Sequence, residues 1–155
     1  MKIVFSSLSV LLLSFAALAQ ESQQVKPKVY VAAGLSVSNT YDTTFSYSSY
    51  PSVEVGLVKN NFSMGLVLGR SNLSNFENDG ISNYWYELKT ALYQPVGDFN
   101  AYGLLGLGNY MSTRRIFIEY GAGFSYSFKA IDVFGQASNW DGTWYVTPGI
   151  SYTFK

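Results

Sequence analysis

Five charged side chains in the central part of the chain occupy equivalent positions in a repeated sequence pattern, and they could therefore act together. Each falls where large apolar and small polar residues alternate, and each lies on the small polar side. These residues are Glu54, Glu87, Lys89, Glu119 and Asp132. Such groups can form ion pairs or attract cations. Because a buried charge without a partner costs several kcal/mol, we expect an ion-pair network in which Lys89, with Arg114 or Arg115, neutralises the acids.

The chain lacks the side chains on which most catalytic sites depend. It contains no histidine, so the usual general base and the commonest metal ligand are missing. It contains no cysteine either, which excludes disulfides and a lipid-modified cysteine. Two glycine runs, at 103–108 and 121–123, lack the following helix and the lysine of a phosphate-binding loop. The formal net charge is +0, which leaves no basic excess for nucleic acid. We therefore expect no enzyme, cofactor, metal site or nucleic-acid partner.

The first residues have the order of a secretory signal peptide. Lys2 precedes an apolar stretch from Ile3 to Leu18, and the small-residue sequence Ala17-Leu18-Ala19 follows before Gln20. A charged residue, an apolar run and a small-residue cleavage site define such a peptide. We predict a signal peptide at 1–19 and one mature domain at 20–155.

The composition of the whole chain is unusual for a domain surrounded by water. Charged residues make up 13% and aromatic residues 17%, whereas a soluble surface is roughly 25–35% charged. After residue 19 no apolar run has the length of a membrane-spanning helix. Only a closed barrel can cross lipid without helices, because every backbone N–H and C=O must then be paired internally.

Period-two alternation, which is typical of a strand between two different environments, recurs in eight segments. These are Val29–Val37, Ser52–Leu57, Phe62–Gly69, Tyr84–Tyr93, Asn100–Tyr110, Ile118–Phe128, Ala130–Ser138 and Trp144–Phe154. The phase of Asn100–Tyr110 and of Ala130–Ser138 is left open. Short and longer connections alternate, the longer ones being 39–49 and 71–83, which suits short periplasmic turns and longer outer loops. The pattern predicts an all-β fold: an eight-stranded antiparallel up-and-down transmembrane β-barrel.

The bulky side of each segment is expected to face lipid. The interior of an eight-stranded barrel is just wide enough for side chains to fill, so a large side chain at every inward position would overfill it. A Lys or Arg on the lipid face at the bilayer midplane costs about 2–4 kcal/mol, and the mid-strand charges lie on the small side. We expect aromatic girdles at both interfaces, with Tyr84 and Trp144 on the outer side and Tyr102 and Tyr152 on the inner.

The end of the chain carries the first of two resemblances. The segment Thr147–Phe154 resembles the C-terminal signal that the outer-membrane barrel assembly machinery reads, although Lys155 follows the closing aromatic residue. This resemblance implies that the machinery recognises Gly149, Tyr152 and Phe154. By architecture over nearly its whole length, the mature chain also resembles the OmpA/OmpX-type small outer-membrane barrels. That resemblance implies an outer-membrane location but does not choose among the roles of such proteins.

Three functional hypotheses follow. The first is a non-enzymatic, structural or adhesin-like barrel in outer-membrane lipid, with an extracellular surface partner contacted by outer-loop residues Tyr41, Phe45, Tyr47 and Tyr50. The second is a narrow pore that prefers cations because its lumen has an acidic excess. The third is a soluble periplasmic barrel that binds an apolar ligand in its cavity.

Overall fold

The computed structural model describes residues 26–40, 46–71, 83–111 and 113–154, and each of the eight predicted segments forms a strand within them. The strands are β1 (Lys28–Thr40), β2 (Ser46–Lys59), β3 (Phe62–Ser71), β4 (Asn83–Val96), β5 (Phe99–Tyr110), β6 (Ile116–Phe128), β7 (Ile131–Trp140) and β8 (Thr143–Thr153). The predicted signal peptide at 1–19 lies outside the described residues. No helix in the described part of the chain is long and apolar enough to cross a membrane.

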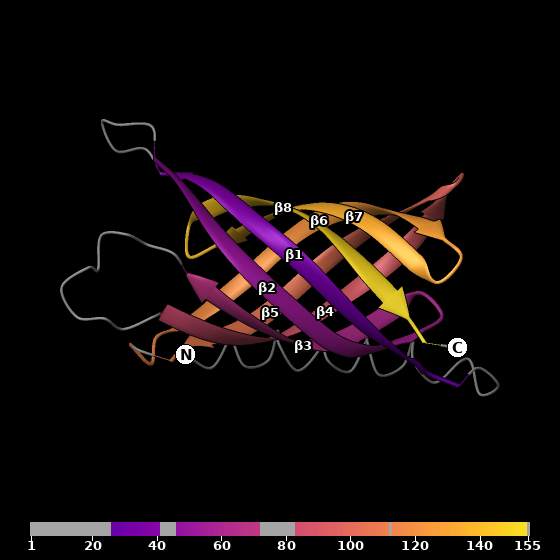
Figure 1. Ribbon diagram of the computed structural model, residues 1–155, viewed down its shortest axis with the longest axis horizontal. Helices are drawn as coiled ribbons and strands as arrows, with labels where there is room; N and C mark the ends of the chain where they lie inside the picture. Colours follow the sequence, from indigo (N-terminus) through magenta and orange to yellow (C-terminus); the bar gives the residue numbers. More distant parts are fainter. Residues whose placement is uncertain (1–25, 41–45, 72–82, 112, 155) are drawn as a thin grey trace, which may run out of the picture.

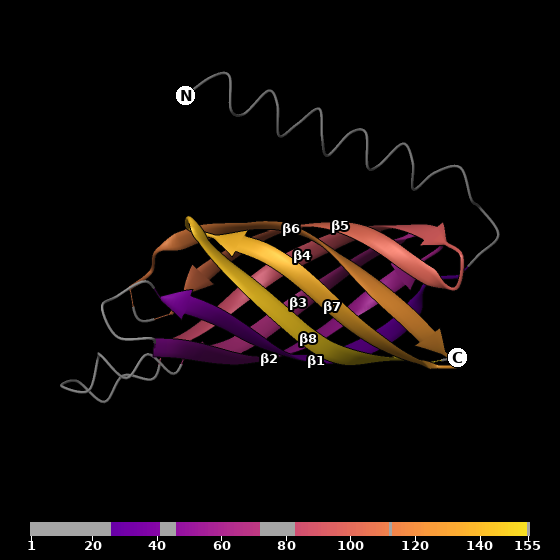
Figure 2. The same cartoon turned by 90° about the horizontal axis from the view of Figure 1, so that it is seen from above.

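The strands form one closed antiparallel barrel, as predicted. Each strand pairs with its neighbours in the chain, and β1 also pairs with β8, from Tyr30 opposite Thr153 to Val37 opposite Val146. Figures 1 and 2 show the strands tilted strongly against the long axis of the barrel. Closure gives the edge strands β1 and β8 a hydrogen-bonded partner on both sides, which meets the backbone requirement for spanning lipid.

The two ends of the barrel differ in their connections. At one end, which we call the turn end, β1 begins, β8 ends, and residues 60–61, 97–98 and 129–130 link the strands. Asn60 and Lys129 have positive φ values of 54° and 58° there, as tight hairpin turns require. At the opposite, loop end the connections are 41–45, 72–82, 111–115 and 141–142. The first of these is shorter than predicted because β1 continues to Thr40 and β2 already begins at Ser46.

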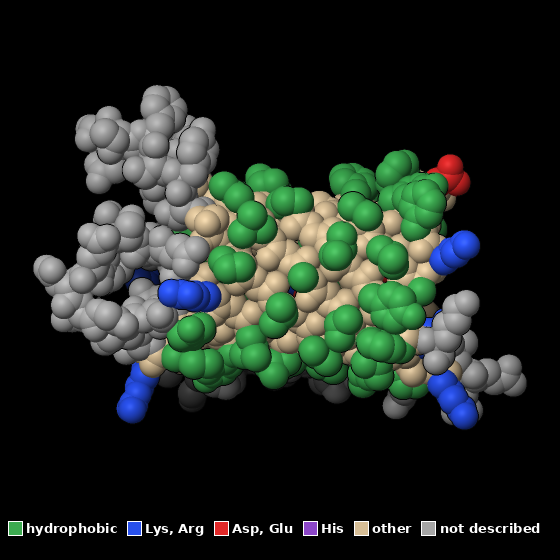
Figure 3. Space-filling view, viewed as in Figure 1, with side chains coloured by type: hydrophobic (Ala, Val, Ile, Leu, Met, Phe, Trp, Pro, Cys, Tyr) green, Lys and Arg blue, Asp and Glu red, His purple; other side chains and the backbone are tan. Residues whose placement is uncertain are grey.

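Alternation between the two faces of the sheet is clear in the exposed fractions of the side chains. In β8, Trp144 and Val146 are 60% and 61% exposed, whereas Thr147 is 4% exposed. Large apolar side chains cover the outside of the barrel between its ends, and Lys and Arg side chains gather at the two ends (Figure 3). The predicted orientation, with the bulky side outward, is thus observed.

The structure settles the phase of the two strands that the sequence left open. In β5 the even-numbered residues face the interior, and Tyr102 is only 8% exposed. Its prediction as part of an aromatic girdle was therefore wrong. Tyr102 fits inside because its cross-strand neighbour is Gly123, where an added Cβ would lie 2.5 Å from the ring. In β7, Asp132 faces the lumen, as predicted, and Gln136 and Ser138 are buried on the same side.

Candidate functional site in the barrel lumen

The five predicted lumen charges all lie inside the barrel, where β2, β4, β6 and β7 bring them together. Lys89 Nζ lies 2.7 Å from Glu54 Oε2, and both side chains are largely buried, at 15% and 11% exposure. The other carboxyl oxygen of Glu54 accepts a hydrogen bond from the Tyr30 hydroxyl. Glu54 is therefore bonded through both oxygens, which is how a buried carboxylate is normally accommodated.

A second polar chain runs across the middle of the lumen. Tyr102 donates its hydroxyl to Gln136 Oε1 at 3.4 Å, and Gln136 Nε2 donates to Glu119 Oε1 at 3.3 Å. Glu87 is fully buried and interacts electrostatically with Glu119, Lys89 and Glu54. Its carboxylate lies over Gly106, where an added Cβ would come within 1.5 Å of Oε1.

The two arginines expected among these charges are elsewhere. Arg115 pairs with Asp141 at the loop end, with 3.4 Å between Nη2 and Oδ2, and Arg114 is exposed in the same region. Lys89 is thus the cation of the lumen in the described part of the chain. Of the expected network, the described residues form one ion pair, between Lys89 and Glu54, and both carboxyl oxygens of the buried Glu87 have no hydrogen-bond partner there. The lumen therefore contains more acidic than basic side chains in the described part of the chain.

Toward the loop end, a cluster of rings fills the lumen; we call it the aromatic plug. Its members are Tyr50, Trp85, Phe117, Trp140 and Tyr145. Trp140 stacks on Tyr145 with 4.5 Å between ring centroids and meets Trp85 edge-on at 4.9 Å. Predicting Tyr50 as an outer-loop contact was wrong, because it lies in β2 and is 5% exposed within the plug.

Glycines on neighbouring strands make room for the plug. Gly69 faces Trp85 and Gly108 faces Phe117 across the ladder, and an added Cβ would lie 2.3 Å and 2.2 Å from the respective rings. The prediction of a lumen lined by small residues is therefore wrong at the loop end, where the plug lies. The sequence did contain a signal for the plug. Trp85 lies on the same face of its strand as Glu87, which was predicted to point inward, and an inward glycine leaves room for a large inward side chain on the neighbouring strand.

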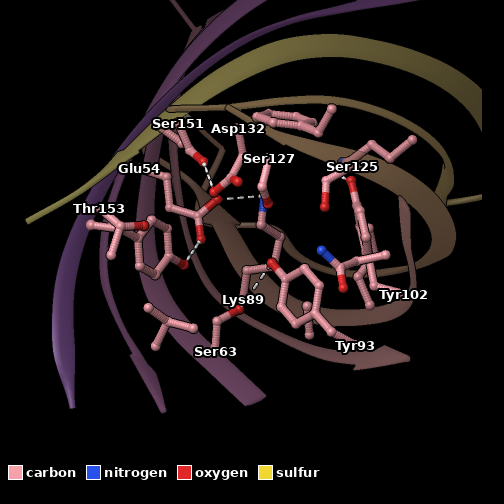
Figure 4. A pocket seen from close by; sticks show the side chains of 18 residues that line it. Glu54, Ser63, Lys89, Tyr93, Tyr102, Ser125, Ser127, Asp132, Ser151 and Thr153 are labelled. Carbon is pink, nitrogen blue, oxygen red and sulfur yellow. Dashed lines mark hydrogen bonds and ion pairs between the residues drawn. The ribbon is translucent and has the colours of Figure 1, made fainter. Parts of the chain in front are cut away.

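Toward the turn end the lumen opens into a cavity of about 160 Å³, lined by 18 residues, several of which Figure 4 labels. We call it the cup. Hydroxyl groups from Ser63, Tyr93, Ser125 and Ser151 are among its lining, with the Lys89 and Glu54 pair at its inner end. Between the cup and the plug, a second cavity of about 20 Å³ adjoins Glu87 and Glu119.

On the outside, aromatic side chains gather at two levels. Near the loop end Tyr84, Tyr120 and Trp144 are exposed, with Tyr120 and Trp144 in edge contact at 6.3 Å. Near the turn end an exposed group consists of Phe99, Tyr126, Phe128, Tyr152 and Phe154. Tyr84 and Trp144 therefore point outward near the loop end and Tyr152 near the turn end, and their place in interfacial girdles stays a prediction.

The three residues that the resemblance to an assembly signal singles out lie on both the inner and the outer face of the barrel wall. Tyr152 and Phe154 point outward and contact each other with 5.0 Å between ring centroids. Gly149 faces inward, where an added Cβ would lie 2.3 Å from the ring of Phe134. Gly149 therefore has a packing role independent of any recognition.

The side chains of the three other predicted outer-loop contacts lie outside the described part of the structure. Tyr41 and Phe45 lie outside the described residues, and for Tyr47 the structure describes only the backbone, in β2. Within the described ranges, no group of three or more Asp or Glu side chains is placed to hold a metal ion.

No family model and no curated protein matches this sequence. Among solved structures, the chain is similar to the N-terminal β-barrel domain of Pseudomonas aeruginosa OprF, with a TM-score of 0.60 and 14% identity over 83% of this chain and 100% of that one. It is similar to Ail, the attachment invasion locus protein of Yersinia pestis, with a TM-score of 0.54 and 14% identity over 84% and 100%. Neisserial surface protein A gives a TM-score of 0.52 and 12% identity over 81% and 97%. The chain therefore has the fold of the small eight-stranded outer-membrane barrels, as the predicted resemblance to the OmpA/OmpX type implies.

Proposed function

We propose that this chain is an integral outer-membrane protein with a non-enzymatic role, exported with removal of residues 1–19. The observation that carries the proposal is the outside of the barrel, where side chains such as Leu66 and Leu88 are 50% and 52% exposed at mid-strand. A water-soluble monomer rarely exposes apolar patches of more than a few hundred Å². A lipid environment accounts for this band, for the two aromatic levels and for charges confined to the rims and the lumen.

Fractionation tests the proposal directly. The protein is expected to stay with membranes after washing at alkaline pH, to dissolve only with detergent, and to begin at Gln20 in the membrane form. It should also migrate differently on gels before and after boiling, because a closed barrel resists unfolding by detergent at room temperature. Release into the aqueous fraction without detergent would support the soluble periplasmic barrel and reject the membrane proposal.

The same gel tests the assembly signal. We propose that the barrel assembly machinery acts on the outward pair Tyr152 and Phe154. Removing Phe154 and Lys155 should reduce the fraction of protein that migrates as folded barrel in cells, whereas removing Lys155 alone should not. Equal folded fractions for the two truncations would exclude recognition of Phe154.

The lumen is better suited to a sealed barrel than to a pore. The plug packs rings from β2, β4, β6, β7 and β8 against one another, and the cup and the smaller cavity beside it lie on the turn side of the plug. The acidic excess of the lumen supports a cation-preferring pore, whereas the ring packing of the plug supports a sealed barrel. We therefore propose a function at the surface of the barrel and not in conduction.

A surface-contact role rests on the loop end, which in the proposed orientation faces the cell exterior. Connections 41–45 and 72–82 join neighbouring strands at this end, and Ail, the attachment invasion locus protein, is among the structures with a similar fold. Replacing 41–45 with a two-residue Asn-Gly turn keeps the pairing of Thr40 with Ser46, and we expect it to lower binding of cells to a host surface by several-fold. The same replacement of 72–82, between the paired Ser71 and Asn83, is the matched comparison, and unchanged binding in both variants would leave the structural role alone.

A further inference from the structure

The cup at the turn end has the form of a ligand site that the surface role does not use. Ser127 lies one residue before the end of β6 and Thr153 ends β8, so the cavity reaches the mouth of the barrel. Its wall includes Tyr30, Tyr93 and Tyr102 with serine hydroxyls between them (Figure 4). In the proposed orientation this mouth faces the periplasm.

The charges of the cup do not balance. Glu54 and Lys89 neutralise each other at 2.7 Å. Asp132 accepts a hydrogen bond from Ser151 Oγ at 3.2 Å, and among the described residues no Lys or Arg forms an ion pair with it. Glu87 and Glu119 lie just beyond, beside the smaller cavity. An occupant of the cup therefore meets one carboxylate, that of Asp132, which has no ion-pair partner among the described residues.

Size and lining restrict the occupant further. A cavity of about 150 Å³ accommodates benzene, so the 160 Å³ of the cup suits a molecule of roughly six non-hydrogen atoms. Hydroxyl groups along the wall can accept hydrogen bonds from a cationic head group. The paired rings of Tyr93 and Tyr102, 5.1 Å apart between centroids, can contribute an attraction for a cation near a ring face.

We propose that the cup binds a small organic monocation, with its ammonium or guanidinium group on Asp132 and its short carbon chain among the tyrosines. The carboxylate supplies the charge, and Ser127 and Ser151 supply neighbouring oxygens. The Glu54 and Lys89 pair and the plug close the lumen behind the cup, so they limit how deeply the ligand can enter from the mouth.

Titration of the isotope-labelled, detergent-folded protein with n-butylammonium tests this proposal by nuclear magnetic resonance. We expect saturable shifts at the backbone amides of Ser127, Asp132 and Ser151, and none with n-butanol, which has the same number of non-hydrogen atoms and no charge. Asp132→Asn should weaken binding at least tenfold, because the amide keeps the bond to Ser151 and loses the charge. Asp98→Asn, in an exposed turn at the same end, should bind like the wild type.

Several outcomes would overturn the site. Equal shifts with n-butanol, unchanged affinity in Asp132→Asn, or shifts that grow without saturation would each reject it. Should Asp132→Asn fail to fold, Ser127→Leu keeps the carboxylate and fills the cup. Loss of binding in Ser127→Leu supports the site, and full binding rejects it. If n-butylammonium causes no shift changes in the wild-type protein, the proposed site is also rejected, independently of where the barrel resides in the cell.

Discussion

Trp85→Ala is expected to lower the free energy of unfolding by about 3–5 kcal/mol, the usual cost of truncating a large buried aromatic residue. Trp85 is 1% exposed and meets Phe117 and Trp140 edge-on, with ring centroids 5.9 Å and 4.9 Å away. The strands around it are fixed by closure of the barrel, so the lumen cannot collapse into the space that the indole leaves. Equilibrium unfolding by denaturant in lipid vesicles measures the change.

Trp144→Ala is the matched control. Trp144 lies on the outside of β8 and is 60% exposed, so lipid or interfacial water replaces its ring and the cost should be much smaller. Similar losses for the two variants would contradict the assignment of one ring to the plug and the other to a girdle.

Planar-bilayer recording gives a second readout of the plug. The wild type should show no conductance steps, while the double variant Trp85→Ala, Trp140→Ala should show them, because two of the rings closing the lumen are gone. Steps in the wild type would reject the sealed lumen and favour a cation-preferring pore.

Lys89→Met is expected to cost about 3–5 kcal/mol, the range for leaving a buried ion pair with one partner. Lys89 interacts electrostatically with Glu54, Glu119 and Glu87, so its removal leaves three neighbouring carboxylates without their cation. Methionine keeps most of the volume of the side chain, and the change therefore reports mainly on charge. The measurement is again denaturant unfolding in vesicles.

A double variant separates charge from packing. Lys89→Met combined with Glu54→Gln should recover much of the loss, because the carboxylate nearest to the missing ammonium is neutralised. Lys28→Met, at an exposed position at the start of β1, should change stability little. If the double variant were as unstable as the sum of the single ones, the ion pair would not be the source of the effect.

The fold follows from the sequence because lipid imposes a strict alternation on the outer face. In β6 and β8 most outward residues are larger or less polar than their inward neighbours, as in Phe124 to Phe128 and Ile150 to Tyr152, so the phase can be predicted from the residues alone. The charges Glu54, Glu87, Lys89, Glu119 and Asp132 were placed inside for the same reason. The outward side of β5 includes Ala101 and Gly103, and the contrast between its faces is therefore too weak to fix the phase.

The plug could not be predicted by the same reasoning, because occupancy of the lumen is a property of several strands together. A rule that large side chains point outward fails for Tyr50 and Tyr102, since each is accommodated by space left on another strand. The positions of Arg114 and Arg115 were missed for a related reason. Their segment forms the β5 to β6 connection at the loop end, and arginine at a rim remains hydrated.

The pairing of inward glycines with inward rings has a consequence for how the hairpins find their alignment. Sliding β3 against β4 by two residues would keep every side chain on its proper face, so hydrophobicity alone cannot forbid it. In the native ladder Trp85 stands opposite Gly69. A two-residue shift would put Val67 or Ser71 there, and the Cβ of either would clash with the indole, since a Cβ added at Gly69 would lie 2.3 Å from the ring. Each pair of an inward glycine and an inward ring therefore favours the native register between two neighbouring strands. The closed sheet is in this way directed to a single alignment of its strands.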